Sequence, residues 1–226
     1  MEFALFHSPL VGPTSWRWVA SSLVAAEHEV AVPDLRAAAV SGDPDVLIAA
    51  AARAVPPRWS TPVLVGHSGF GSIMPSVAER LSGRASRLVF VDAGLPPCDG
   101  PATASADFLD HLRRLASDGV LPAWSTWRGE GVMERLVAAD DRRAALEAEM
   151  PEIPLAFFES PISFPEGWCQ TRGAFLLLSE PYRDDAKRAQ VLGWPIVERR
   201  GGHLDIANDP DAIARMIAEL ASGPVR

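Results

Sequence analysis

Residues 63–71 read Val-Leu-Val-Gly-His-Ser-Gly-Phe-Gly, and the prediction of the fold starts from them. A short apolar run ends at Gly66, Ser68 follows, and a helical pattern covers residues 72–81. This order predicts a strand, a tight turn and a helix, with the Ser68 hydroxyl pushed out above a sheet. The small residues around the serine fit a strained turn that neighbouring strands approach closely. The N–H of Gly69, directly after the serine, is placed to stabilise an oxyanion.

Short apolar runs alternate with helical patterns along the rest of the chain. The predicted strands cover residues 3–7, 29–33, 62–66, 87–91, 174–178 and 196–198. Predicted helices cover residues 15–26, 45–54, 72–81 and 211–220. This alternation predicts the α/β class, with a doubly wound, mostly parallel sheet of about six strands and helices on both faces.

Residues 95–170 interrupt the alternation. Apolar residues at helical spacing over 108–115 predict an amphipathic helix, and residues 131–150 predict one or two more. The segment is too long for a structureless loop in a compact domain. We therefore predict a core domain formed by residues 1–94 and 171–226, into which residues 95–170 insert as a helical cap.

The sequence around Ser68 resembles the nucleophile elbow of the α/β-hydrolase family, in the common form Gly-His-Ser-x-Gly. The order of elements resembles that family over nearly the whole chain, whereas only short motifs match in detail. The family's second glycine would stand at position 70, where this chain has Phe70, and Gly71 comes one residue later. We expect the Phe70 side chain to point toward a pocket. Pro75, inside the following helical pattern, is expected to kink that helix.

His203 is the candidate general base among five histidines. It follows two glycines, after the last predicted strand and before the terminal helix, where the resemblance implies the base. A neutral imidazole there can take the serine proton and return it to the leaving group. His67 flanks the serine and is expected to point away from it, and His7 is expected to make structural hydrogen bonds.

The acid partner of His203 stays open between three residues. The resemblance implies an acid after the strand at 174–178, but Tyr182 occupies that position, and Glu180 and Asp184 are out of register. Some family members, such as haloalkane dehalogenases, take the acid from the end of the preceding strand, where Asp92 stands. We place Asp92 first, Glu180 second and Asp184 third.

The second oxyanion donor is also open. In the family it comes from the loop after the first central strand, and here Pro9 stands at the usual position without an N–H. Leu10 is our first candidate for the missing donor and Val11 the alternative. The Ser8 hydroxyl is a weaker candidate for an additional donor.

Aromatic residues are frequent in the predicted cap and favour a small apolar or aromatic substrate. The residues expected to contact that substrate are Phe70, Trp124, Trp127, Phe158 and Trp168. The leading functional hypothesis is a cofactor-independent serine hydrolase that cleaves an ester, thioester or lactone. One alternative is a lyase or cyclase of natural-product metabolism on the same triad, and the other is a non-catalytic ligand-binding protein on a hydrolase scaffold.

Composition narrows the remaining function classes. A net charge of −8 disfavours nucleic-acid partners, and no apolar run is long enough to span a membrane. No close cluster of histidine and acidic residues predicts a metal site. Cys98 and Cys169 could pair with each other, but we predict two free thiols in a reducing, cytoplasmic setting. The sequence is compatible with a homodimer and does not decide the oligomeric state.

Overall fold

A six-stranded sheet forms the centre of the computed structural model, which describes residues 1–101, 103–127, 129 and 131–223. All neighbouring strands pair in parallel, in the order β2-β1-β3-β4-β7-β8. The bounds are β1 (Glu2–Phe6), β2 (Glu29–Ala31), β3 (Val63–Ser68), β4 (Arg87–Ala93), β7 (Gly173–Leu177) and β8 (Ile196–Glu198). The α/β class and the parallel sheet predicted from the sequence are therefore confirmed.

Both faces of the central strands are buried, which explains why these strands read as continuous apolar runs. In β1, Phe3 and Leu5 join the apolar core on one face, while Ala4 and Phe6 join the core on the other. The same alternation continues through β3, β4 and β7. Side chains of successive strand residues point to opposite faces, so one apolar strand supplies both cores.

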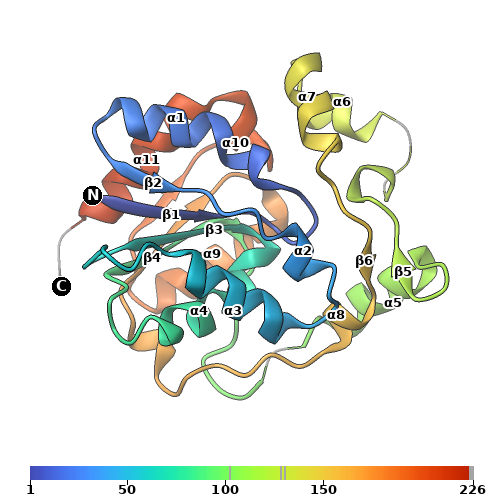
Figure 1. Cartoon of the computed structure of the whole chain (residues 1–226), viewed down its shortest axis with the longest axis horizontal. Helices are drawn as coiled ribbons and strands as arrows, with labels where there is room; N and C mark the ends of the chain where they lie inside the picture. The colour runs from blue at the N-terminus through green and yellow to red at the C-terminus, as the bar shows by residue number, and fades with distance from the viewer. Residues whose placement is uncertain (102, 128, 130, 224–226) are drawn as a thin grey trace.

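Helices cover each face of the sheet (Figure 1). Packing of α1 against α11 covers one face, and α3, α4 and α9 cover the other. The bounds of these helices are α1 (Arg17–Ala25), α3 (Pro44–Ala54), α4 (Met74–Arg80), α9 (Arg183–Val191) and α11 (Pro210–Ser222). Shorter segments connect them: α2 (Arg36–Ala39), α10 (Asp205–Asn208), and the 3-10 helices η1 (Pro13–Trp16), η2 (Gly69–Ile73) and η5 (Glu180–Tyr182).

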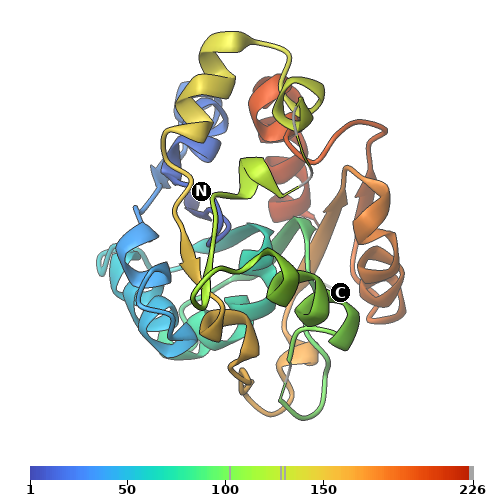
Figure 2. The same cartoon turned by 90° about the vertical axis from the view of Figure 1, so that its right-hand side faces the viewer.

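The segment between β4 and β7 lies beside the carboxyl ends of the strands, on the right in Figure 1 and facing the viewer in Figure 2. Its elements are α5 (Ala106–Leu115), β5 (Val120–Leu121), η3 (Trp124–Thr126), α6 (Val132–Leu136), α7 (Asp140–Glu147), β6 (Ile153–Pro154), α8 (Ala156–Glu159) and η4 (Trp168–Gln170). β5 and β6 pair as a small antiparallel ribbon that the sequence analysis did not predict. Residues of α6 and α7 pack against Val11 and Leu204, in the loops that follow β1 and β8. The interpretation of residues 95–170 as a separate cap domain stays a prediction.

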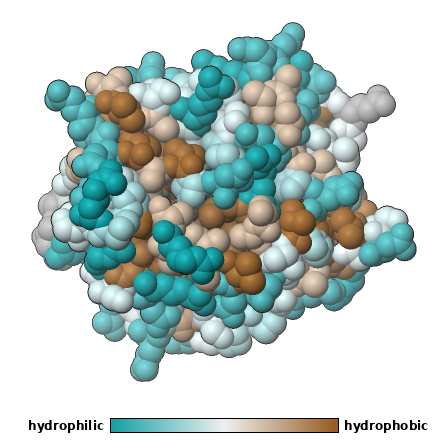
Figure 3. Space-filling model, in the orientation of Figure 1, coloured by the Kyte–Doolittle hydropathy of each residue, from teal (hydrophilic) through white to brown (hydrophobic). Residues whose placement is uncertain are grey.

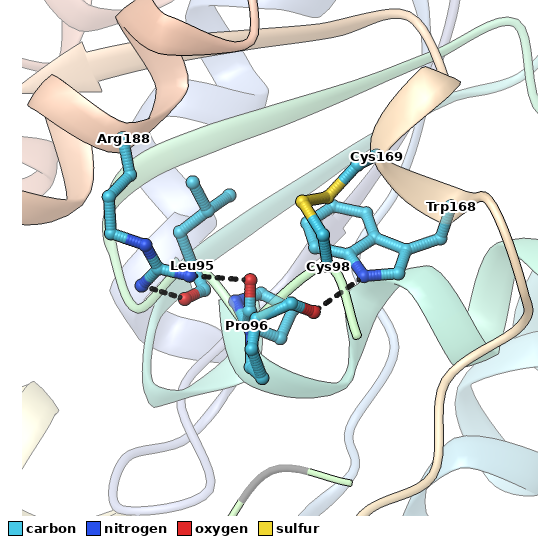
Figure 4. The surroundings of a disulfide bond; sticks show 7 residues. Leu95, Pro96, Cys98, Trp168, Cys169 and Arg188 are labelled. Atoms are coloured by element: carbon cyan, nitrogen blue, oxygen red, sulfur yellow. Dashed lines mark hydrogen bonds between the residues drawn. A yellow bond between two sulfur atoms is a disulfide. The ribbon is translucent and has the colours of Figure 1, made fainter. Parts of the chain in front are cut away.

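The prediction of two free thiols is wrong. Cys98 and Cys169 form a disulfide, with their Cα atoms 5.5 Å apart and a separation of 71 positions in sequence (Figure 4). Because β4 and β7 are neighbours in the sheet, the two ends of the segment between them return to adjacent positions. Linear spacing does not reveal that proximity. The thiol argument for a reducing compartment no longer applies, and the cytoplasmic location stays a prediction.

The surface carries both polar and apolar residues. Figure 3 shows hydrophilic residues over much of one face, with apolar residues gathered in patches between them. Within the described ranges, no helix combines the length and the apolar character that crossing a bilayer requires.

Candidate active site

Ser68 ends β3 in a backbone conformation that serine rarely adopts, with φ 57° and ψ −128°. The register between β3 and β4 shifts at this point, so that Ser68 pairs with Ala93 instead of Asp92. Such strain persists only where the surrounding structure holds the chain firmly. Here it places a half-buried serine at the carboxyl edge of the sheet, at the start of η2.

Asp92 lies at the end of β4, and its side chain is fully buried. Its carboxylate accepts hydrogen bonds from the backbone N–H groups of Leu178 and Ser179, at 2.8 and 2.9 Å, and from the Ser179 hydroxyl. Burial acts to raise the pKa of Asp92, but its hydrogen bonds, above all that with His203, lower the pKa below its usual range. The group is therefore a carboxylate near neutral pH.

His203 comes to Asp92 from the loop between β8 and α10. Its Nδ1 lies 2.7 Å from Asp92 Oδ2. A carboxylate can only accept, so this contact places a proton on Nδ1 and leaves Nε2 of the neutral ring as an acceptor. Within the described part of the chain, the Ser68 hydroxyl makes no hydrogen bond to His203, and in a substrate-free site such bonds are often long.

His67 packs against the imidazole of His203 and contacts its backbone. The two rings stack with centroids 4.5 Å apart, and His67 Nε2 lies 3.0 Å from the backbone carbonyl of His203. Burial, together with the positive charge that His203 can carry, lowers the pKa of His67 to about 3. His67 is therefore neutral and donates to the His203 carbonyl through Nε2–H, facing away from the serine as expected.

The two other candidate acids lie on the surface. Glu180 pairs with Arg183 at 2.7 Å, and its side chain is 75% exposed. Asp184 pairs with Lys187 at 2.8 Å, and its side chain is 90% exposed. Of the three candidates, the structure brings only Asp92 to the imidazole.

Tyr182 is the site residue for which the sequence analysis proposed no role. Its hydroxyl lies 3.0 Å from Ser68 Oγ, and its ring stacks on His203 with centroids 5.2 Å apart and planes 12° from parallel. It stands where the family would place an acid, so a polar group was expected at this position, but its contact with the serine was not. The two residues are 114 positions apart, and no local pattern links them.

The loop after β1 lies against the turn at Gly69. The Cβ position of Gly69 is 3.6 Å from both Ser8 Oγ and Pro9 Cδ. The Leu10 N–H is directed to Ser8 Oγ at 3.3 Å, and the Val11 N–H donates to the Ser8 carbonyl at 3.2 Å. Gly69 is the first residue of η2, and the first N–H groups of a helix have no acceptor inside it.

Two of the five aromatic residues predicted to contact substrate, Trp124 and Phe158, are only partly buried. Trp124 packs edge-on to His203, with ring centroids 6.2 Å apart. Phe158 joins the same small apolar cluster as Trp124 and Leu10. Trp124 therefore gives His203 an apolar neighbour.

Trp168 and Phe70 are buried in the core under the sheet-covering helices, which corrects the prediction for both. Trp127 instead belongs to the cluster that Trp124 and Phe158 pack against, and its contact with substrate stays a prediction. Trp127 packs among residues of α5 and β5, and its Nε1–H donates to the Pro122 carbonyl at 2.9 Å. Trp168 lies in the core beside the disulfide, and its Nε1–H donates to the Pro97 carbonyl at 2.8 Å (Figure 4). Phe70 is fully buried and stacks on a core phenylalanine.

Comparison with known proteins now identifies the family. The family described as "Alpha/beta hydrolase family" matches residues 5–216. The chain belongs to the alpha/beta hydrolase family. It is an enzyme of that fold.

Two sequence relatives and one solved structure of similar fold illustrate the match of this α/β hydrolase. A "Carbendazim hydrolyzing esterase" from Nocardioides sp. (strain SG-4G) is 26% identical over 97% of this chain and 99% of its own. "Polyketide synthase GfsA" from Streptomyces halstedii is 28% identical over 73% of this chain, which spans 2% of that longer protein. An extracellular alpha/beta-hydrolase from a Paenibacillus species, 19% identical, superposes with a TM-score of 0.79 over 99% of this chain and all of its own.

The structure also accounts for the two irregular positions of the elbow. A Cβ atom on Gly71 would lie 2.4 Å from the carbonyl oxygen of Gly94, so glycine is required at 71, where the chain passes the end of β4. Position 70 instead faces the core, which accommodates Phe70. Pro75 lies in the first turn of α4, where no N–H is needed, so the expected kink does not arise.

Proposed function

We propose that this α/β hydrolase is a serine hydrolase that cleaves a small ester, thioester or lactone through an acyl-enzyme on Ser68. The observation that carries the proposal is the 2.7 Å contact of His203 Nδ1 with buried Asp92, beside a serine on a strained turn. That arrangement is the one a Ser-His-Asp triad uses on unrelated folds. The esterase named among the relatives supports the same reaction class.

Acylation follows from the positions of the protons. Asp92 keeps the proton of His203 on Nδ1, so Nε2 can accept the proton of Ser68 as Oγ attacks the carbonyl carbon. In the substrate-free structure the Ser68 hydroxyl contacts Tyr182, and we infer that it turns toward Nε2 when substrate binds. The imidazolium then protonates the leaving alcohol or thiol.

Deacylation repeats these steps with water. His203 takes a proton from the water that attacks the acyl carbonyl, and returns it to Ser68 Oγ as the acid leaves. Asp92, held by Leu178 and Ser179, stays ionised and stabilises the imidazolium in both halves of the reaction. No step requires a cofactor.

The proposed oxyanion hole combines the N–H of Gly69 with that of Leu10. Gly69 follows the nucleophile and begins η2, where a free N–H is expected. The Leu10 N–H points to Ser8 Oγ at 3.3 Å, a long contact that a developing oxyanion could replace. Val11 is disfavoured because its N–H already donates to a backbone carbonyl at 3.2 Å.

The proposed substrate is small and has an apolar or aromatic acyl or alcohol group. Leu10, Trp124 and Phe158 pack against one apolar cluster, and Trp124 of this group contacts the His203 ring. Apolar walls with few polar groups are typical of small-molecule sites. The proposal therefore favours aryl or short alkyl esters over charged or polymeric substrates.

Turnover of a panel of aryl esters in isotopically labelled water tests this proposal. We expect the wild type to release acid that carries one oxygen from water, with Ser68→Ala and His203→Ala slower by about a thousandfold or more. Glu180→Gln, at an exposed acid beside the site, is the matched control and should keep wild-type rates. Hydrolysis that survives in Ser68→Ala would contradict the proposal, and cleavage without oxygen from water would favour a lyase.

A further inference from the structure

Tyr182 contacts both the proposed nucleophile, Ser68, and the proposed base, His203. Its hydroxyl lies 3.0 Å from Ser68 Oγ while its ring lies flat against the His203 imidazole. It follows directly from β7 through η5, next to Ser179, whose hydroxyl binds Asp92. One short segment therefore holds the carboxylate, packs on the imidazole and contacts the serine oxygen.

We propose that the Tyr182 hydroxyl is a catalytic group that donates a hydrogen bond to Ser68 Oγ whenever that oxygen carries negative charge. The proposal rests on the serine-hydrolase function proposed above. It adds a fourth catalytic residue to the serine, the histidine and the aspartate.

The direction of the hydrogen bond follows from proton counting. Ser68 has one O–H, and general-base catalysis commits that proton to His203 Nε2. Ser68 Oγ can then only accept from Tyr182. A phenol, with a pKa of about 10, is also a better donor than an aliphatic alcohol. We therefore assign Tyr182 as the donor once a substrate has drawn the Ser68 proton toward His203.

The donor acts on charge that exists only in the transition states. As Ser68 loses its proton to His203, charge builds on Oγ, and the bond from Tyr182 becomes charge-assisted and stronger. In the acyl-enzyme Oγ is a neutral ester oxygen and a weak acceptor. In deacylation the C–O bond to Ser68 breaks and its electron pair stays on Oγ, while Tyr182 again donates and His203 returns the proton. Tyr182 keeps its own proton throughout, so each step balances.

Tyr182→Phe separates the hydroxyl from the ring. The phenyl group keeps the stacking on His203, so a residue that only packs would be replaced without loss. We expect kcat/KM for aryl esters and the rate of fluorophosphonate labelling to fall by about tenfold to a hundredfold, with little change in KM. Ser86→Ala is the matched control because its hydroxyl donates to the Thr61 carbonyl, at the amino ends of β3 and β4 and thus at the opposite end of these strands from the site.

A second measurement does not depend on the folding of that variant. Tyr182 is the only tyrosine of the chain, so the ultraviolet absorbance of tyrosinate reports its ionisation alone. A fluorophosphonate adduct leaves Ser68 Oγ without a proton, so this oxygen can only accept, and a bond from Tyr182 then stabilises the neutral phenol. The pKa of Tyr182 should therefore be higher in the adduct of the wild type than in Ser68→Ala, which has no oxygen to accept the bond.

The outcomes separate this inference from the function on which it rests. Slow turnover in Tyr182→Phe, with a phenol pKa that is higher in the wild-type adduct than in Ser68→Ala, supports it. Wild-type or faster turnover in Tyr182→Phe overturns it, as does a phenol pKa in the adduct that is equal to or lower than that in Ser68→Ala. If instead Ser68→Ala itself hydrolyses esters at the wild-type rate, the serine-hydrolase function fails.

Discussion

At the scale of single residues, the Asp92 carboxylate orients the imidazole of His203 and links the end of β4 to the chain that follows β7. It binds His203 Nδ1 through Oδ2 and two backbone N–H groups, of Leu178 and Ser179, through Oδ1. The backbone of Asp92 is itself unusual, with φ 44°, at the point where β4 loses register with β3. This bulge turns the side chain along the edge of the sheet toward His203.

Asp92→Asn should therefore reduce activity far more than a loss of charge at the surface would. An amide in this position can present its NH₂ to His203 and favour the wrong imidazole tautomer, so we expect kcat to fall by about a thousandfold or more. Asp184→Asn, at a fully solvated acid, should leave kcat unchanged. Steady-state kinetics on one aryl ester measures both variants, and equal rates would show that Asp92 does not orient the base.

The stability of a Gly71 variant tests whether the turn after Ser68 requires glycine at this position. A Cβ there would meet backbone at 2.4 Å, so we expect Gly71→Ala to lower the free energy of unfolding by about 1–3 kcal/mol or more. Gly94→Ala is the matched control, because a Cβ at that position meets nothing within 4 Å. Urea unfolding of the two variants measures the difference, and equal stability would mean that the end of β4 can shift.

The residues of the site differ in how far sequence alone identified them. Ser68 and His203 lie in short local patterns with a fixed place in the order of elements. Asp92 stayed one of three candidates because the choice depends on which side chain the tertiary fold brings to the imidazole. Tyr182 was missed because its partner is distant in sequence. Phe70 was misassigned because an irregular motif position was interpreted as functional when it only faces the core.

At the scale of elements, the segment between β4 and β7 is anchored at both ends. Arg188 of α9 donates to the backbone carbonyls of Leu95 and Pro96, at 2.6 and 2.7 Å, where the segment begins (Figure 4). The disulfide then joins Cys98, close to its start, to Cys169, close to its end. The elements that surround His203 from this segment are thus held to the core at their base.

Loss of the disulfide should destabilise the protein. Closing a loop of this length restricts the unfolded chain, so we expect Cys98→Ser with Cys169→Ser to lower the free energy of unfolding by about 2–4 kcal/mol. Reductant should have the same effect on the wild type and none on the double variant. Urea unfolding with and without reductant measures this, and a wild type whose stability is unaffected by complete reduction would contradict it.

The four central strands, β1, β3, β4 and β7, were predicted well because each is an apolar run with both faces buried. For residues 95–170 the sequence predicted only that helices form one inserted segment. Its β5–β6 ribbon has two residues on each strand, too few for any periodicity to show. The disulfide between Cys98 and Cys169 was not predicted because it depends on the order of strands in the sheet, which brings the two ends of this segment together.

At the scale of the whole molecule, the site lies where ligands bind in open α/β sheets, at the carboxyl ends of central strands. Two residues that hold the backbone around the site, His67 and His7, are buried, neutral histidines. Burial lowers the pKa of His67 to about 3 and also lowers the pKa of His7, whose Nε2 accepts from the Leu35 N–H at 3.0 Å. These rings protonate far more readily in the unfolded chain, so folding is linked to pH.

Stability should therefore fall as the pH falls below 6.5, the ordinary pKa of histidine, toward about 3. In this window the unfolded chain binds the extra protons, and each neutral histidine removes about 1.4 kcal/mol per pH unit. Asp92, whose pKa is lowered, adds a further loss only below about pH 4.

His67→Gln should reduce this pH dependence while keeping a donor toward the His203 carbonyl. Urea unfolding at about pH 7 and about pH 5 should show a smaller loss in the variant than in the wild type, by about 1–2 kcal/mol. An equal loss in the two proteins would mean that His67 is protonated in the folded state.

The central claim is that Ser68 is a nucleophile activated by His203 and Asp92. Reaction with a fluorophosphonate, followed by peptide mapping, tests it most directly in the wild type, His203→Ala, Asp92→Asn and Glu180→Gln. We expect the phosphonyl group on Ser68 in the wild type and in Glu180→Gln, and almost no labelling in the other two variants. A well-folded wild type that is not labelled, or is labelled equally well without His203, would contradict it.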